Sequence, residues 1–218
     1  MTIIIESHKK SLKTLEKEYP GAEILDVTSH ATDKELVKLS PFYPHHDIPV
    51  PYTQGMTAAC VEAVWQGLKV FETQDVDVET FKNDTMKNIK RTVRRFGKPL
   101  GHRKGVNGKE LLSYGDARKM IYIPTYSWML EHKAMNVIKR LREESKTKTI
   151  VLLDYNTNAD IDNLSQPLSH ASLVKAYVEG TYPYEKDLNA PHNDKPATDS
   201  GDSDKKGPQK GSQLSFDF

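Results

Sequence analysis

Four residues between positions 62 and 69 have side chains and a spacing that could support chemistry. Glu62, Trp65, Gln66 and Lys69 follow an i, i+3, i+4, i+7 pattern, so on a helix they form one column. A carboxylate can transfer a proton, an amine can attack a carbonyl carbon, and a Trp ring can stack on a substrate. A solvated helix face would show the same spacing, but an exposed Trp is uncommon. The column is therefore our first candidate for a substrate site.

This column requires a helix, which the sequence predicts over residues 57–71. Thr57 can cap its start. Apolar side chains recur on the face opposite the column, at Val61, Val64, Leu68 and Phe71. We expect this apolar face to pack into the core, with Glu62 and Lys69 about 10 Å apart along the axis on the other face. A small polar substrate could lie along that distance.

Basic residues are concentrated between positions 82 and 104, where Asp84 is the only acid. We predict a helix over residues 78–96 with a basic stripe, then a glycine-rich loop over residues 97–113 whose backbone could approach phosphates. The net charge of the chain is only +1, so phosphate or nucleic acid must be bound by such a local patch. A solvated basic face is the alternative. The candidate phosphate- or nucleic-acid-binding residues are Lys90, Arg91, Arg94, Arg95, His102 and Arg103.

Polar residues follow a buried strand that we predict over residues 150–153. Residues at the carboxyl ends of strands often line a ligand crevice. The last predicted helix, residues 169–178, could bring His170 beside them. Asx-rich turns give the same spacing without any function. This second candidate set for substrate binding consists of Asp154, Asn156, Asn158 and His170.

We expect neither a metal nor a cofactor. Cys60 is the only cysteine, which excludes an internal disulfide and a cysteine-rich zinc site. His45, His46 and Asp47 carry metal-ligating groups, but adjacent residues rarely reach the same ion. A loop contact to substrate or solvent is the better interpretation of this motif.

The remaining pattern predicts an α+β fold, a helix-rich domain over residues 1–184 with a small sheet. Its first elements are expected to be a strand over 2–5, a helix over 7–17 and a strand over 23–27. In that helix we expect Leu12 and Leu15 to face inward. This order of elements indicates a small βαβ unit at the start of the chain.

Prolines shape two further segments. Four of them make residues 40–53 an irregular loop or an edge strand, and Pro124 should break or kink the mainly helical residues 115–142. No apolar run approaches the length of a membrane span, and the N-terminal apolar run is too short for a signal peptide. We expect a cytoplasmic protein with no membrane contact, either bacterial or, if phage-encoded, in the host cytoplasm.

The C-terminal residues differ in composition from the rest. Residues 185–212 are rich in Pro, Asp, Lys, Ser and Gly, and such a stretch cannot offset its ordering entropy by burial, so we predict a disordered linker. Residues 213–218, QLSFDF, are apolar again and resemble the bacterial peptide that binds the replication sliding clamp. A random apolar end is the alternative. The expected partner-binding residues are Gln213, Leu214, Phe216 and Phe218.

Three motifs in residues 39–71 together resemble the signature of the NADAR family. They are Leu39-Ser40-Pro41-Phe42, then Ile48-Pro49, then Val61-Glu62-x-x-x-Gln66-x-x-Lys69-x-Phe71. This chain has Leu39 in place of the family's first aromatic residue and Pro41 in place of its usual Asn. The resemblance therefore implies a divergent branch, with a single helix-rich NADAR-like domain.

The resemblance also implies a function, that of an N-glycosidase, which is a hydrolase. The expected substrate carries an ADP-ribosyl or nucleotide-derived N-glycosidic bond, and ADP-ribosylated DNA is one candidate. Glu62 would stabilise charge at the anomeric carbon or transfer a proton, and Lys69 would form a Schiff base with the opened sugar. Phe42, Trp65 and Gln66 would hold the ribose or the base. The alternative is a non-catalytic nucleotide- or nucleic-acid-binding accessory protein recruited to a sliding clamp.

Overall fold

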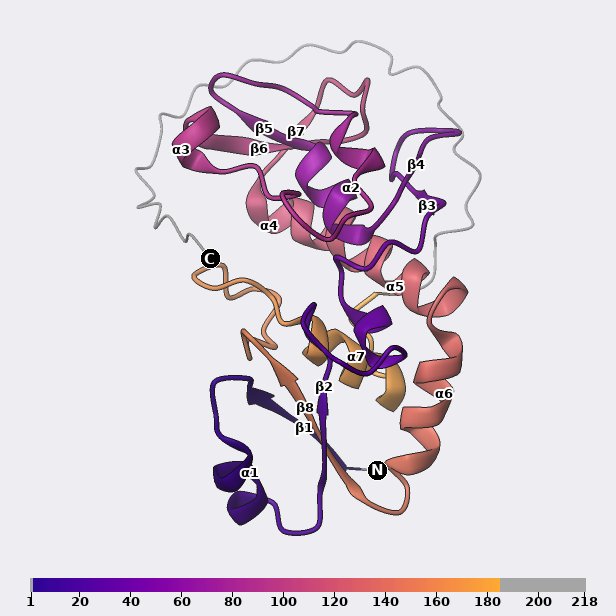
Figure 1. The fold of residues 1–218 in the computed structure, drawn as a ribbon. Coiled ribbons are helices and arrows are strands. Elements are labelled where there is room, and N and C mark those ends of the chain that lie inside the picture. Colours follow the sequence, from indigo (N-terminus) through magenta and orange to yellow (C-terminus); the bar gives the residue numbers. More distant parts are fainter. Residues whose placement is uncertain (1, 185–218) are drawn as a thin grey trace, which may run out of the picture. The chain divides into compact units, whose positions relative to one another are not determined.

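Three parallel strands form one sheet of the protein, whose computed structural model describes residues 2–184 (Figure 1). They are β1 (Thr2–Ser7), β2 (Glu23–Asp26) and β8 (Thr149–Asp154), in the order β1-β8-β2. Ile3 lies opposite Ile150, and Leu25 lies opposite Leu152. The predicted strand–helix–strand start is confirmed, with β8 between its two strands.

Helices cover both faces of this sheet. They are α1 (Leu12–Glu18) and α7 (His170–Glu179). On one face Leu15 of α1 packs against Val151 and Leu153. Ile150 and Leu152 point to the other face, where α7 packs against β1 and β8 in the main core. The alternation of side chains along β8 therefore divides the apolar interior between two layers of helix.

Serine caps start both of these helices. Ser11 Oγ accepts the Thr14 N–H, and Ser169 Oγ accepts the Ser172 N–H. Because α1 begins directly after Ser11, Leu12 lies in its first turn and is 62% exposed, so the prediction that Leu12 faces inward is wrong. The predicted final helix is confirmed as α7.

A second, antiparallel sheet lies beside α2 (Val61–Gly67). Its strands are β5 (Lys69–Phe71), β6 (Pro99–Arg103) and β7 (Leu111–Leu112), in that order. Residue Gly67 packs closely at the end of α2, since a Cβ there would lie 2.2 Å from the Phe81 ring. The chain then enters β5 after the single residue Leu68, so the end of α2 and the start of β5 lie close together.

The prediction of one helix over residues 57–71 is wrong at both ends. Residues Thr57–Ala58 form β4, which pairs with β3 (Ile48–Pro49), and Cys60 rather than Thr57 caps α2. At the other end, residues 69–71 form β5 because they pair with β6. The apolar stripe is confirmed, since its four members, Val61, Val64, Leu68 and Phe71, are all buried.

The prediction of a helix over residues 78–96 is also wrong. Only a 3₁₀ turn at Thr80–Lys82 and the short α3 (Val93–Phe96) form there. Between them Asn83 Oδ1 accepts the Thr85 N–H, and Met86 and Asn88 have positive φ angles of 58° and 57°. Asn and Asp side chains compete with helical hydrogen bonds in this way. The following segment, predicted as loop, contains β6 and β7.

Residues 115–142 are mainly helical, as predicted. The elements are α4 (Tyr114–Ala117), a π-helical segment (Arg118–Tyr122), α5 (Ile123–His132) and α6 (Met135–Glu144). Pro124 lies in the first turn of α5, where its missing N–H costs little, and the irregularity falls in the π-helical segment before it. The α+β class is confirmed.

Two predictions concern ends of the chain. Within residues 2–184 no helix is long and apolar enough to cross a membrane. The predicted linker, residues 185–212, and the predicted partner-binding peptide, residues 213–218, lie outside the described residues. The partner-binding residues Gln213, Leu214, Phe216 and Phe218 are therefore predictions that the structure leaves untested.

Candidate active site

Glu62 and Gln66 lie one turn apart on α2, and the structure buries both side chains. Glu62 is 8% exposed. Gln66 Nε2 donates to Glu62 Oε1 at 2.9 Å, and Gln66 Oε1 accepts the Arg91 backbone N–H at 3.0 Å. Both polar ends of Gln66 are thus occupied within the protein. Gln66 orients Glu62, and the expected contact of Gln66 with a substrate would use the second N–H or the second lone pair of its amide.

Burial acts in opposite directions on Glu62 and Lys69. Burial raises the pKa of Glu62, against the hydrogen bond from Gln66 and the charges of Lys90 and Lys69. Lys69 is the first residue of β5 and is half-buried. Burial lowers the pKa of Lys69, and the charge of Glu62 only partly opposes this. Each group is biased toward its neutral form, a protonated carboxyl and a free amine, which is what an acid and a nucleophile need.

His102 covers one face of Trp65. The two ring centroids are 3.7 Å apart, with the planes at 33°. His102 lies opposite Lys69 in the β5–β6 pairing, so both side chains are on one face of the sheet. Burial lowers the pKa of His102 to about 3, with the positive charge of Lys69 adding to the effect. Within residues 2–184 neither ring nitrogen has a hydrogen-bond partner. A neutral His102 can hydrogen-bond a ligand but brings no positive charge to a phosphate.

Two tyrosines complete this group of rings, and the sequence interpretation missed both. Tyr114 and Tyr122 present their edges to Trp65, with centroids at 5.8 and 5.7 Å. Tyr122 also stacks on Tyr126 at 6.1 Å and 12°. The i, i+4 spacing of Tyr122 and Tyr126 in the sequence was the pattern that could have predicted this ring pair. We use the name Trp65 cluster for Glu62, Trp65, Lys69, His102 and Tyr122.

Arg91 lies inside the protein, so the predicted basic stripe is wrong. The guanidinium donates to the backbone carbonyls of Gln66 and Asp75 at 3.1 and 2.9 Å, and also to that of Lys69. Arg91 thereby ties the segment before α3 to the end of α2 and to β5. Arg103 is paired with Asp75 at 2.7 Å. The absence of a helix over residues 78–96 is the physical reason that these bases do not share one face.

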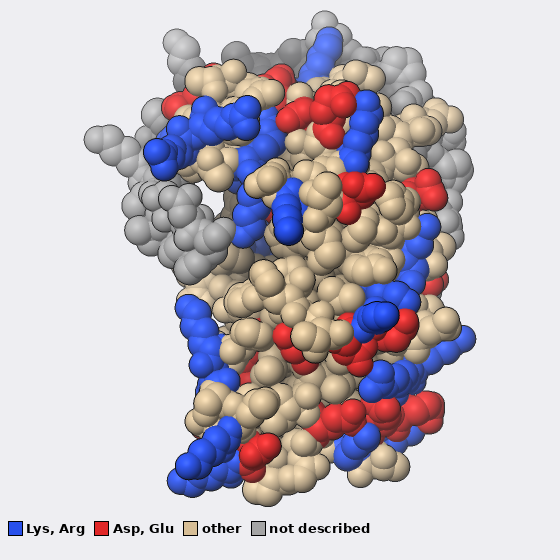
Figure 2. Space-filling model, viewed as in Figure 1, with Lys and Arg blue, Asp and Glu red and all other residues tan. Residues whose placement is uncertain are grey.

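Arg94 and Arg95 remain exposed on α3. Figure 2 shows Lys and Arg side chains gathered in the upper left of the view, where Figure 1 has α3. A cavity of about 170 Å³ lies below them, lined by Lys90, Arg91 and Arg95 and by the single acid Asp77. The cavity is a candidate for an anionic group.

Phe42 lies near one of these cations. The Lys90 ammonium is 5.8 Å from the centroid of the Phe42 ring. The predicted substrate-binding residue Phe42 is thus placed close to the predicted phosphate-binding residue Lys90, although the two lie far apart in the sequence.

The second predicted group brings Asp154 and His170 together. Asp154 Oδ2 is 3.0 Å from His170 Nδ1, and His170 Nε2 is 2.8 Å from the Val27 carbonyl. Both ring nitrogens face acceptors, so both donate and the ring is cationic. Burial opposes ionisation of Asp154, but the charge of His170 and hydrogen bonds from Ser169 and Ala171 lower its pKa to about 2. Despite burial, Asp154 raises the pKa of His170. We use the name Asp154–His170 pair for these two residues.

Asn156 and Asn158 shape the loop after β8. Asn156 Oδ1 accepts the Asn158 N–H at 2.8 Å, and Asn158 Oδ1 accepts the Asp160 N–H at 3.1 Å. Asn158 Nδ2 donates to the Asn163 carbonyl at 3.2 Å. These contacts correspond to the Asx-turn alternative.

The His45-His46-Asp47 motif lies in the irregular segment before β3. His45 Nε2 is 2.8 Å from the Lys38 carbonyl, and His46 and Asp47 have positive φ angles of 59° and 53°. Within the described part of the chain, no group of three or more His, Cys, Asp or Glu side chains is arranged to hold a metal ion.

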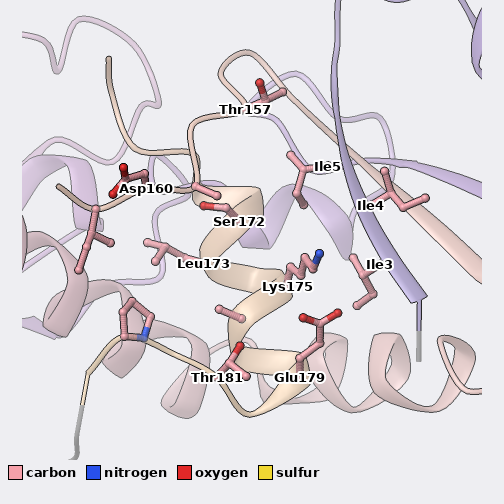
Figure 3. Close-up of a pocket in the computed structure, with 14 residues that line it drawn as sticks. Ile3, Ile4, Ile5, Thr157, Asp160, Ser172, Leu173, Lys175, Glu179 and Thr181 are labelled. Carbon is pink, nitrogen blue, oxygen red and sulfur yellow. The ribbon is translucent and has the colours of Figure 1, made fainter. Parts of the chain in front are cut away.

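A cavity of about 550 Å³ lies between β1 and α7 (Figure 3). Ile3, Ile5 and Leu173 give it an apolar wall, and Lys175 and Glu179 stand at its side. None of the predicted site residues lines it. The buried polar atoms that have no partner within residues 2–184 lie elsewhere. The site residues predicted from the sequence therefore lie outside this cavity.

Comparison with protein families matches residues 7–174 to a family of unknown function, DUF6939. No curated protein matches the chain. The matched range contains both the Trp65 cluster and the Asp154–His170 pair.

Proposed function

This chain belongs to that family of unknown function, and from its site we propose that it is an N-glycosidase. Its substrate would carry an ADP-ribosyl or nucleotide-derived N-glycosidic bond, with ADP-ribosylated DNA among the candidates. The observation that carries the proposal is that Glu62 and Lys69 lie close enough for the charge of each to act on the pKa of the other. Glu62 is buried and Lys69 is half-buried, and burial displaces each pKa toward the neutral form. Displaced pKa values in a specific pair are typical of functional sites.

The chemistry of the bond suits this pair. Departure of an amine from the anomeric carbon requires a proton on the leaving nitrogen, which a protonated Glu62 can supply. A free Lys69 amine can attack that carbon in the opened sugar and form a Schiff base, which water then hydrolyses. Both residues lie in the segment that resembles the NADAR family, whose members are N-glycosidases.

A phosphate-bearing substrate is favoured by the cavity of about 170 Å³. Lys90, Arg91 and Arg95 line it. Arg91, in the cavity wall, is linked to Glu62 through Gln66, because the Arg91 N–H donates to Gln66 and Gln66 donates to Glu62. We propose that a phosphate bound there leaves the attached sugar on the side of Glu62 and Lys69.

The competing proposal is a non-catalytic nucleotide- or nucleic-acid-binding protein that residues 213–218 recruit to a replication sliding clamp. The hydrogen bond from Gln66 to Glu62 is the observation that favours it, because a buried and bonded carboxyl can serve packing alone. In that case the basic cavity would hold a ligand that is never cleaved.

Turnover separates the two proposals. The full-length protein is incubated with ADP-ribosylated DNA and with a nucleotide library, and released base or ADP-ribose is detected by mass spectrometry. We expect release by the wild type, and Glu62→Gln should bind the same ligand in an equilibrium titration without releasing product. Binding without release by the wild type would contradict the N-glycosidase. The absence of both binding and release would contradict both proposals.

A further inference from the structure

The π-helical segment Arg118–Tyr122 interrupts the α4–α5 helical region beside the Trp65 cluster. Single π-turns are rare and occur often at functional sites. Its first residue, Arg118, is buried, and its guanidinium donates to the carbonyls of Asn163 and Gln166, both at 2.8 Å. Its last residue is Tyr122. The segment is thus anchored at one end and places a tyrosine in the cluster at the other.

Tyr122 lies close enough to Glu62 for the charge of that carboxylate to act on the Tyr122 pKa. Its ring makes a T-shaped contact with Trp65, which follows Glu62 by one turn of α2. The Tyr122 ring is fixed from the other side by its stack on Tyr126. Burial raises the pKa of Tyr122 well above its ordinary value, and the charges of Glu62 and Asp154 add to this. The hydroxyl is therefore a neutral proton donor over the whole physiological range.

The neighbouring tyrosine hydroxyls differ from that of Tyr122. Tyr126 donates to the Leu39 carbonyl at 2.6 Å, and Tyr182 donates to the Ile123 carbonyl at 2.9 Å. Within residues 2–184 the Tyr122 hydroxyl makes no such bond. Tyr122 is a half-buried residue, and the hydroxyl that these described residues leave unused is available to a ligand.

We infer that Tyr122 is a catalytic residue of the proposed N-glycosidase, whose hydroxyl protonates the ring oxygen of the sugar as the ring opens. The inference rests on the proposed function, since a Schiff base at Lys69 needs an open sugar. The lone pair of the glycosidic nitrogen forms a double bond to the anomeric carbon, the bond from that carbon to the ring oxygen breaks, and the oxygen takes the Tyr122 proton. The substrate class is accordingly an N-riboside whose nitrogen retains a lone pair.

The later steps return the proton. Lys69 adds to the anomeric carbon, and the amine departs with a proton from Glu62, which recovers one from the Lys69 nitrogen. Water hydrolyses the Lys69 imine and releases the open sugar. When the ring closes, the sugar hydroxyl gives its proton back to the Tyr122 phenolate, and the new anomeric hydroxyl takes its proton from the Lys69 ammonium, which restores the free amine. The sum is N-riboside plus water giving amine plus sugar, with no other reactant.

Tyr122→Phe removes only the oxygen and keeps both ring contacts. We expect kcat on the N-riboside to fall by about 10²-fold or more, with KM changed by no more than a few-fold. Tyr126→Phe is the matched control, since it breaks the bond to Leu39 and should reduce the melting temperature while kcat is retained. Retention of full kcat in Tyr122→Phe overturns the inference.

An acyclic aldehyde distinguishes a catalytic role from a structural one. Glyceraldehyde has no ring to open, so after borohydride reduction it should label Lys69 equally in wild type and Tyr122→Phe. The N-riboside should label Lys69 in the wild type and should not label it in Tyr122→Phe. If Tyr122→Phe loses Lys69 labelling equally with the N-riboside and with glyceraldehyde, Tyr122 only positions the site. That result overturns the inference. If the wild type releases sugar from no N-riboside, both the proposed function and this inference are contradicted. If the wild type is active and Tyr122→Phe is equally active, only this inference is contradicted.

Discussion

Two buried carboxylates, Glu62 and Asp154, have opposite surroundings. Asp154 faces the His170 cation and accepts the Ser169 hydroxyl, and its pKa falls to about 2. Within residues 2–184 Glu62 accepts a hydrogen bond from the neutral Gln66, and burial raises its pKa. The charge of Asp154 is compensated by an adjacent cation, whereas that of Glu62 is compensated only in part, by the charges of Lys90 and Lys69.

The buried histidines repeat this contrast. His170 donates from both ring nitrogens, whereas His102, 2% exposed, has no partner on either within the described residues. Buried polar groups without partners cost stability. The Asp154–His170 pair therefore stabilises the fold by joining β8, α7 and the segment after β2. The Trp65 cluster keeps under-compensated groups, which is the pattern expected of a site prepared for a ligand.

Glu62→Gln should have the largest effect, and it should act on turnover. We expect kcat to fall by about 10²–10⁴-fold, because a general acid contributes that much. The free energy of unfolding at pH 7 should stay the same or rise, because a poorly compensated buried charge is removed. Product release and urea unfolding measure the two effects. A marked loss of stability in Glu62→Gln would show that Glu62, like Asp154, stabilises the fold.

Asp154→Asn is the same chemical change in the other region, and it should act on stability. The free energy of unfolding should fall by about 3–5 kcal/mol, because removing one partner of a buried ion pair leaves the other uncompensated. The kcat of the folded fraction should be retained. Urea unfolding at pH 6 checks this, and wild-type stability in Asp154→Asn would contradict the contrast.

The Asp154–His170 pair also predicts a pH dependence. The pKa of Asp154 is lowered from its ordinary 3.8 to about 2, so its contribution is present above pH 3.8 and is lost as pH falls toward 2. The pKa of His170 is raised from its ordinary 6.5, so its contribution is present below pH 6.5 and is lost as pH rises through the folded value. The difference in unfolding free energy between wild type and Asp154→Asn should therefore be largest from about pH 4 to 6.5. A difference that stays constant from pH 3 to 9 would argue against the ion pair.

The smallest effect is expected from the exposed bases of α3. Arg94→Glu with Arg95→Glu should weaken binding of a DNA or nucleotide ligand, and for DNA should reduce the slope of log affinity against log salt by about 2. The melting temperature should not change, since both side chains are exposed. Arg140→Glu, on α6, compared with Arg94→Glu alone, is the control for a single charge reversal elsewhere on the protein. Equal binding by wild type and the double variant would identify the α3 bases as a solvated face.

The sequence predicts the parts of the Trp65 cluster that depend on local periodicity. Val61 and Val64, two of the four apolar residues at helical spacing, lie on the buried side of α2, and all four are buried. The ends of α2 could not be predicted, because they depend on strand partners at residues 48–49 and 99–103. Pairing with distant residues overrides the local preference for helix.

The basic residues between positions 82 and 104 show that composition alone does not predict the surroundings of a charged side chain. A count of charges cannot reveal that the Arg91 guanidinium is satisfied by backbone carbonyls, among them those of Gln66 and Asp75. Tyr122 was missed for a related reason, since its place beside Trp65 depends on one π-helical segment. His102 was selected as a base near phosphate, yet burial makes it a neutral ring.

The central claim is that the Trp65 cluster binds a sugar and links it to Lys69. The most direct measurement is borohydride trapping of the full-length protein with an ADP-ribosyl N-riboside, followed by peptide mass spectrometry. The account predicts a reduced sugar adduct on Lys69 in the wild type and in the folded fraction of Asp154→Asn, and its loss in Lys69→Arg. An adduct of equal yield in Lys69→Arg, or none on the Lys69 peptide of a wild type that releases product, would contradict it.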